Sequence, residues 1–211
     1  ASRFGWLCIN NIRQTPALAE CTSVSFVNAV LLAANMGLEI RRNSAYLIPY
    51  GKECQLLIDY RGKMELARRA GAKAITVELV REHDGFEYRI TNDGPVLSHS
   101  PLKFRKVDGR LVAVPQSERG EVVLGYVLAD LGGKHPQVEV MTVDEIEAIR
   151  ARSKSGCGRP KEYYGKTLQA LTLADIRNLD WQALAFKHPY RCPWVTDWDQ
   201  MARKTLIHRA M

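Results

Sequence analysis

Residues 44–69 constrain the fold of this chain most strongly, because they combine a tight turn with two different periodicities. Two apolar runs between residues 44 and 58 flank a Pro-x-Gly turn at 49–51, a combination typical of a β-hairpin. Residues 60–70 then follow a helical period and stop at Gly71. The stretch therefore predicts a hairpin that leads directly into a short helix.

Two more hairpins are predicted from alternating apolar residues. One joins 75–79 to 86–90 through a turn at Asp84-Gly85, and the other joins 121–129 to 136–141. We expect residues 92–118 to be mostly loop. Hairpins interspersed with helices predict an α+β fold, with an antiparallel β-sheet of hairpins packed with helices.

Further helices are predicted at residues 3–14 and 23–36. On the second helix the expected buried face consists of Val24, Val27, Leu31 and Ala34. The spacing [ST]-x-x-[DE] recurs at Thr142, Thr172 and Thr196, and it is typical of a capping box at the start of a helix.

The charge balance favours a polyanionic partner. The net charge is +7 at pH 7, and neutralising phosphates would release condensed counterions. The five cysteines are odd in number and none forms a C-x-x-C pair, so we expect a reducing compartment rather than a disulfide framework. No apolar run is long enough for a membrane span, and a soluble cytoplasmic protein is expected.

The helix at 60–70 places basic side chains on one side. Arg61, Arg68 and Arg69 gather there together with Glu65. This face would suit phosphate contacts. The alternative is a solvated face on which Glu65 pairs with Arg61 and Arg69.

A helix that begins at residue 197 has a similar pattern. Its expected inward stripe consists of Trp198, Met201, Ala202 and Thr205, and Arg203 and Lys204 straddle the opposite face. Arg209 falls in line with the apolar stripe. Tyr46 and Trp198 are expected in the core, whereas Tyr50 and Trp194 lie in or beside turns, where an aromatic ring is able to stack on a base.

Competing chemistries have weaker signals. Gly165-Lys166-Thr167 resembles the end of a phosphate-binding loop, but Pro160 stands where that loop needs glycine. His188 and Cys192 have no second ligand pair for zinc. We therefore expect no catalytic residues, no metal and no cofactor. A metal-dependent nuclease, a nucleotide-dependent recombination enzyme and a plain protein-interaction module remain alternatives.

Two long stretches carry a resemblance to a known family. Residues 44–69 and Pro193-Trp194-Val195-Thr196-Asp197 through Thr205 resemble, in order, the signature of the RecT family of phage and prophage single-strand annealing proteins. Residues 12–18, 33–39, 86–88 and 138–153 also match the family pattern. The resemblance implies an annealing-protein core over 1–156 and 193–211. Residues 157–192 depart from the family pattern, and we expect them to form a mostly helical insertion with short helices at 167–171 and 173–185.

The resemblance also implies a function. Such proteins anneal complementary single strands of DNA without ATP, assemble into rings or helical filaments with DNA in a basic groove, and commonly act with a phage exonuclease. The expected partners are single-stranded DNA, annealed duplex and further copies of the chain, in the cytoplasm of a bacterial host. Family motif position and helical phase together nominate residues for DNA contact. The first choices for phosphate are Lys52, Arg61, Lys63, Arg68, Arg203 and Lys204, the second choices are Arg69, Arg209, Lys103 and Arg105, and Gln55 and Trp194 are candidates for sugar or base.

Overall fold

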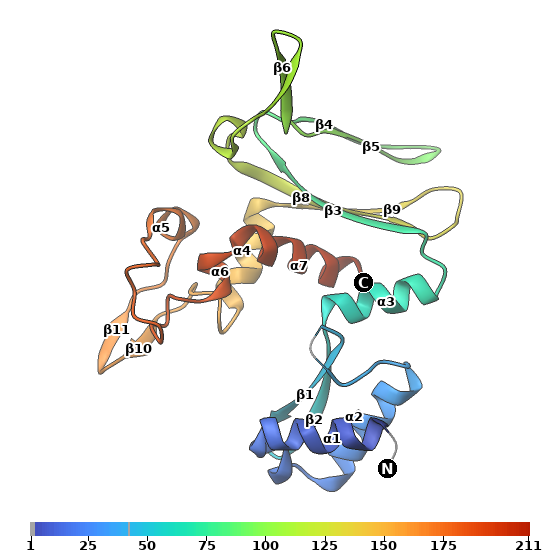
Figure 1. The fold of residues 1–211 in the computed structure, drawn as a ribbon, viewed down its shortest axis with the longest axis vertical. Helices are drawn as coiled ribbons and strands as arrows, with labels where there is room; N and C mark the ends of the chain where they lie inside the picture. The colour runs from blue at the N-terminus through green and yellow to red at the C-terminus, as the bar shows by residue number, and fades with distance from the viewer. Residues whose placement is uncertain (1–2, 42) are drawn as a thin grey trace. The chain divides into compact units, whose positions relative to one another are not determined.

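A computed structural model describes residues 3–41 and 43–211 (Figure 1). The chain divides into two compact units: residues 1–72 with Met211, and residues 73–210. Helices and antiparallel strands occur in both units, which confirms the predicted α+β class. No helix among the described residues combines the length and hydropathy needed to cross a membrane.

The first unit consists of helices around a single hairpin. Its elements are α1 (Arg3–Gln14), the 3-10 helix η1 (Pro16–Glu20), α2 (Ser23–Asn35), β1 (Ala45–Tyr50), β2 (Glu53–Ile58) and α3 (Tyr60–Arg69). The pairing of β1 with β2 confirms the predicted hairpin, with Tyr50 opposite Glu53 at its closed end. The Ser25 hydroxyl accepts a hydrogen bond from the Cys54 backbone N–H at 3.0 Å and so fastens α2 to β2.

The buried face of α2 is not the one predicted. Val24, Val27 and Leu31 are 71%, 51% and 53% exposed, whereas Ser25, Ala29 and Ala33 are buried. The small side chains of this second set let the helix approach β2 closely, and that packing outweighs the burial of the larger apolar side chains. The prediction assumed that the larger apolar side chains would be buried, and it was wrong about which face of the helix is buried.

The second unit is built on a three-stranded antiparallel sheet in the order β3-β8-β9. Its strands are β3 (Ala74–Arg81), β8 (Val122–Asp130) and β9 (Gln137–Thr142). Figure 1 shows α4 (Val143–Arg152) and α7 (Trp198–Ala210) on one side of this sheet, and the hairpin of β4 (Gly85–Thr91) and β5 (Gly94–Ser100) on the other. The β8–β9 pair confirms the hairpin predicted between 121–129 and 136–141.

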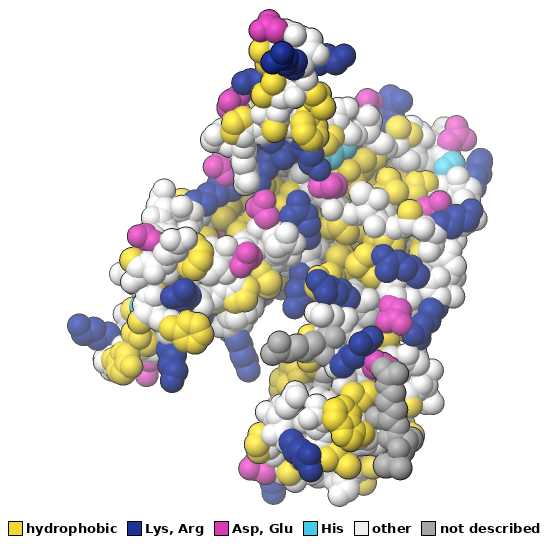
Figure 2. Space-filling view, in the orientation of Figure 1, with side chains coloured by type: hydrophobic (Ala, Val, Ile, Leu, Met, Phe, Trp, Pro, Cys, Tyr) yellow, Lys and Arg dark blue, Asp and Glu magenta, His cyan; other side chains and the backbone are white. Residues whose placement is uncertain are grey.

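Strand pairing differs from the prediction elsewhere in this sheet. β3 pairs with β8 rather than with β4, and β4 pairs with β5 inside the stretch expected to be loop. That stretch also holds the hairpin of β6 (Phe104–Val107) and β7 (Arg110–Ala113), followed by the 3-10 helix η2 (Gln116–Arg119). Every residue of β6 and β7 is exposed, and Figure 2 shows hydrophobic and basic side chains next to one another on this projecting hairpin.

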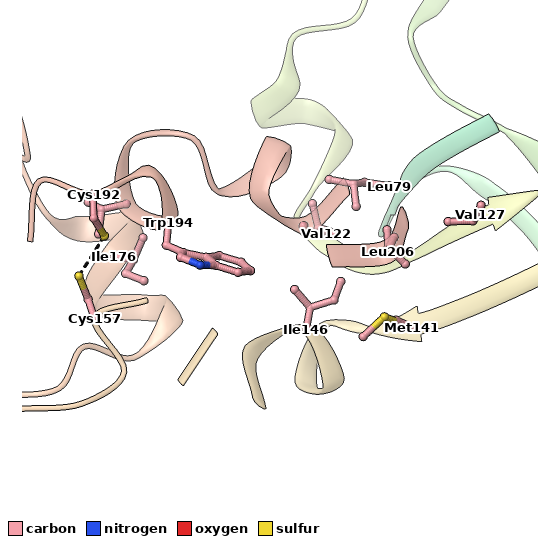
Figure 3. Close-up of a cluster of buried hydrophobic side chains, with 12 residues drawn as sticks. Leu79, Val122, Val127, Met141, Ile146, Cys157, Ile176, Cys192, Trp194 and Leu206 are labelled. Atoms are coloured by element: carbon pink, nitrogen blue, oxygen red, sulfur yellow. Dashed lines mark hydrogen bonds between the residues drawn. The ribbon is translucent and has the colours of Figure 1, made fainter. Parts of the chain in front are cut away.

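The core of the second unit lies between the sheet and its helices (Figure 3). Leu79, Val127 and Met141 from the strands meet Ile146 of α4 and Leu206 of α7. Gly125 makes this contact possible, because a β-carbon there would lie 2.5 Å from Cδ1 of Leu206. The ring of the next residue on β8, Tyr126, lies edge-to-face against His99 and tilted against Phe86 of the β4–β5 hairpin. β8 therefore contacts the helices on one side and this hairpin on the other.

Residues 157–192 contain less helix than predicted. They form the hairpin of β10 (Lys161–Tyr163) and β11 (Lys166–Leu168) and one helix, α5 (Leu173–Asn178). The helix expected at 167–171 is absent there, and the one expected at 173–185 ends at Asn178. The capping boxes at Thr142 and Thr172 are present. At Thr196 the hydroxyl instead donates to Asp197, and the short helix α6 (Pro193–Thr196) precedes α7.

A buried carboxylate holds the turn after β3. Asp84 accepts hydrogen bonds from the backbone N–H of Leu102 at 2.7 Å and from the Arg119 guanidinium at 2.8 Å, and it lies 3.4 Å from Nε2 of His99. Burial acts to raise the pKa of Asp84, but the hydrogen bonds from Leu102, Arg119, Arg81 and His99 outweigh it and lower the pKa from 3.8 to about 2. The charged form is therefore the one that stabilises this turn.

We expect Asp84→Asn to lower the free energy of unfolding by about 3 kcal/mol near neutral pH, because Arg119 then stays largely buried without its counter-charge. A carboxylate with a lowered folded pKa stabilises above its unfolded pKa, near 3.8, and this contribution is lost as the pH falls toward about 2. Urea denaturation across this range should show the gap between wild type and variant closing. Asp93→Asn, an exposed change of equal charge, is the control, and equal losses for the two variants would contradict the role of Asp84.

Candidate nucleic-acid interface

Helix α3 is seated directly on the base of the first hairpin. A β-carbon on Gly62 would lie 2.3 Å from the Ser44 carbonyl oxygen and 3.0 Å from Cγ2 of Ile58, so only glycine permits this approach. The Asp59 backbone N–H also donates to the Ser44 carbonyl at 2.9 Å. These contacts set the direction in which the side chains of α3 point.

Arg61 and Arg68 share the exposed side of α3. They are seven residues apart, which is two turns of helix, and both are exposed. The Arg61 Nε donates to the Tyr60 hydroxyl at 2.9 Å, and its guanidinium lies over the Tyr60 ring at 5.6 Å from the centroid. This hydrogen bond raises the pKa of Arg61. Within the described part of the chain, Arg68 has no ion-pair partner.

Arg69 is bonded to the end of α2. It donates to the carbonyl oxygens of Met36 and Gly37 at 3.1 and 3.0 Å, at the end of α2, and it pairs with Glu65. The alternative of a Glu65 ion pair is therefore realised with Arg69. Lys52 is exposed at the tip of the first hairpin, Gln55 is exposed on β2, and Lys63 is half-buried on α3.

A second surface is a groove in the second unit, with a volume of about 510 Å³. Its walls come from the end of α4 with the residues that follow it, from α6 and from one side of α7. The lining residues are Ile149, Ser153, Ser155, Trp194, Met201, Lys204, Thr205, His208 and Arg209. We call this surface the α4–α7 groove.

The α4–α7 groove combines an apolar floor with a polar rim. Ile149 and Met201 provide apolar surface, and Lys204 and Arg209 provide positive charge. The hydroxyl oxygens of Ser153 and Ser155 lie 3.2 Å apart on the same rim. Cations and hydroxyls suit phosphate oxygens, and an adjacent apolar surface suits the sugar or the face of a base.

The sequence of the chain matches one family over nearly its whole length. The model of the RecT family matches residues 2–211. This chain belongs to the RecT family. It is also 31% identical to Protein RecT of Escherichia coli (strain K12) over 220 residues, which cover 99% of this chain and 64% of that relative. The chain thus spans just under two thirds of the length of this RecT relative.

In this member of the RecT family, several predicted DNA contacts already have acidic partners. Arg203 and Lys103 both approach the carboxylate of Glu78, at 3.8 and 3.6 Å. Arg105 pairs with Glu118 at 2.6 Å, in the β6–β7 hairpin region. Of these, none lines the α4–α7 groove.

Arg209 is also paired, although it lines the groove. Its Nε donates to Glu139 at 2.6 Å, and its Nη2 lies 3.9 Å from Glu145. The predicted position in line with the apolar stripe is therefore not a buried one, since the side chain is 47% exposed. Lys204 of α7, also a predicted contact for phosphate, lines the groove together with Ser153 and Ser155.

The burial of Trp194 contradicts its expected contact with a base or sugar. Trp194 is 2% exposed and belongs to the same core cluster as Ile146 (Figure 3). Sequence analysis also missed Ser153, Ser155 and His208 as groove residues. The two serines lie at the start of a polar stretch without helical periodicity. His208 follows Lys204 by one helical turn, and that spacing was the available signal.

We expect Gly62→Ala to loosen α3 in this RecT-family chain at a cost of about 1–3 kcal/mol, because the new methyl group meets the Ser44 carbonyl oxygen. Hydrogen exchange should become faster in α3 and in the β1–β2 hairpin. Gly133→Ala is the control, since its β-carbon would meet only the His135 carbonyl oxygen at 3.8 Å. Exchange in α3 that is equally slow in both variants would refute the close packing.

Proposed function

We propose that this chain binds single-stranded DNA and anneals complementary strands without ATP, as a protein of homologous recombination. The observation that carries the proposal is the α4–α7 groove, which Lys204, from a family-matching stretch, lines together with Ser153 and Ser155. Membership of the RecT family and a net charge of +7 support it. No covalent chemistry is part of the proposal.

Phosphate contacts are the main source of affinity in this proposal. Lys204 meets one phosphate as a mobile point charge, and the serine hydroxyls donate to its oxygens. Ile149 and Met201 shield the sugar from water on the floor of the groove. None of these groups reads a base edge, so sequence specificity comes from pairing between the two strands.

The exposed side of α3 is a second phosphate surface in this proposal. Arg61 and Arg68 stand about 10 Å apart along the helix axis, at a rise of 1.5 Å per residue. A strand that follows the helix meets both guanidinium groups, and each forms paired hydrogen bonds with a phosphate. Lys52, Lys63 and Gln55 complete the nominated contacts in the same unit.

Assembly and partners are further parts of the proposal. Subunits form a ring or helical filament, in which the basic surfaces of successive copies make one continuous path for DNA. The strands reach the protein as overhangs made by a phage exonuclease, in the cytoplasm of a bacterial host. Family membership supports these points. The groove of one copy holds only a short piece of strand, so a longer strand needs several copies side by side.

The annealing proposal predicts acceleration of pairing between two complementary oligonucleotides. Purified protein should raise the annealing rate above the protein-free rate without any nucleotide, and EDTA should leave the rate unchanged. A fluorescence-quench assay measures the rate, and a denaturing gel confirms that both strands stay intact.

Two outcomes of that assay would count against annealing. Metal-dependent loss of the strands would favour a nuclease. Intact strands that bind but do not anneal faster would reduce the function to single-strand binding.

Phosphate contact also predicts a change in salt dependence. Arg61→Ala with Arg68→Ala removes two contacts, so the slope of log affinity against log salt should become less negative by about 1.4, and Lys204→Ala should change it by about 0.7. Matched controls are Arg13→Ala in the first unit and Lys166→Ala in the second, both exposed cations outside the nominated surfaces. Fluorescence anisotropy with a labelled single strand gives the slopes, and slopes equal to those of the controls would remove the surface concerned from the proposal.

A further inference from the structure

Two cysteines meet at the ends of the segment 157–192. The Sγ atoms of Cys157 and Cys192 lie 3.1 Å apart and share a hydrogen bond, drawn as the dashed line in Figure 3. Cys157 is fully buried and Cys192 is 9% exposed. A disulfide bond is about 2.05 Å long, so the two sulfur atoms are about 1 Å from bonding distance.

Local structure holds the two thiols together. The carbonyl oxygen of Cys157 accepts from the Leu171 backbone N–H at 2.7 Å, which folds the β10–β11 hairpin back onto this point. Gly156, just before it, is bound through its carbonyl oxygen by Arg150 at 2.5 Å. Cys192 immediately precedes α6, so its position follows from the start of that helix.

The surroundings of the pair distinguish one sulfur from the other. Hydrogen bonding from Cys157 is the main cause that lowers the pKa of Cys192 to about 6, and the backbone N–H groups of Trp194 and Val195 act in the same direction. The same hydrogen bond to Cys192, together with burial, raises the pKa of Cys157. These shifts favour the thiolate at Cys192 over Cys157, and Cys192 is also the more exposed member of the pair.

We propose that Cys157 and Cys192 form an oxidation site at which a hydroperoxide converts the two thiols into a reversible disulfide. Nothing in the proposed annealing activity requires this site. The pair differs from Cys54, which is also buried but lies in the other unit, in the core beneath the first hairpin.

The reaction proceeds in two balanced steps. The Cys192 thiolate attacks one peroxide oxygen, the O–O bond breaks, and the leaving hydroxide or alkoxide takes a proton, which leaves a sulfenic acid on Cys192. The sulfur of Cys157 then attacks the Cys192 sulfur, the S–O bond breaks, and the hydroxyl leaves as water with the Cys157 proton. Two thiols are oxidised by two electrons and one peroxide is reduced, and a dithiol reductant reverses the change.

Oxidation would fasten both ends of the segment 157–192 to each other. Cys157 follows Ser155 by two residues, and Cys192 precedes Trp194 by two residues, so the new bond would join two walls of the α4–α7 groove. A covalent link here restrains the unfolded chain and raises the melting temperature. An effect of oxidation on DNA binding would rest on the proposed function, whereas formation of the disulfide does not.

The test is to count free thiols in the full chain before and after exposure to hydrogen peroxide in the presence of EDTA. Alkylation under denaturing conditions should label all five cysteines of the reduced protein and three after oxidation, since 5 − 2 = 3. Peptide mapping should find Cys157 linked to Cys192 within one chain, and the oxidised form should melt at a higher temperature.

Single variants separate the two steps. Cys157→Ser should leave Cys192 as a sulfenic acid that a dimedone-type reagent labels, and Cys192→Ser should react slowly and form no disulfide. Cys54→Ser is the control and should lose two thiols to peroxide like the wild type. Five labelled cysteines after oxidation of the wild type, or a link between any other pair, would overturn the proposal whatever the protein does to DNA.

Discussion

The second unit depends on one buried guanidinium, that of Arg150. It is 3% exposed, and it donates to Glu147 at 2.8 Å, to the Gly156 carbonyl oxygen at 2.5 Å and to the Leu171 carbonyl oxygen at 2.8 Å. A buried charge is tolerated only when its hydrogen bonds are satisfied in this way. Glu147 in turn accepts from the indole N–H of Trp198 at 2.8 Å. Arg150 and its partner Glu147 therefore join α4 to the segment 157–192 and to the start of α7. Of these, α4 and α7 contribute walls to the α4–α7 groove.

Charge on this protein is only partly available to a ligand. Helical phase identifies which cations point outward, but it says nothing of acids contributed by other elements. Glu78 of β3 approaches both Arg203 and Lys103, and the carboxylate of Glu139 holds Arg209. Such pairs on the surface contribute little stability, so a phosphate is able to replace the carboxylate at modest cost.

Strand positions were more predictable than strand partners. Alternation located the strands near 75–79, 86–90, 121–129 and 136–141, because successive side chains of a strand point to opposite faces. The Asp84-Gly85 turn favoured pairing of the first two of these. In the structure the Asp84 carboxylate is instead buried among Arg119, His99 and Leu102. β3 pairs with β8, and β4 pairs with β5. The partners of Asp84 lie 15 to 35 positions further along the chain, so a local sequence pattern does not reveal them.

Sequence alone predicts the α+β class, the hairpin with α3, two capping boxes and membership of the RecT family, because each of these is encoded in short-range spacing or in stretches that match the family. Tertiary structure alone decided which cations remain accessible, which face of α2 is buried, and that Trp194 belongs to the core. It also brought Cys157 beside Cys192, and it placed Lys204 and Ser153 on the walls of one groove. These outcomes depend on packing between elements that are remote in sequence. The close approach at Gly62 and the hydrogen bonds of Arg150 are examples of such contacts, and short-range patterns do not encode them.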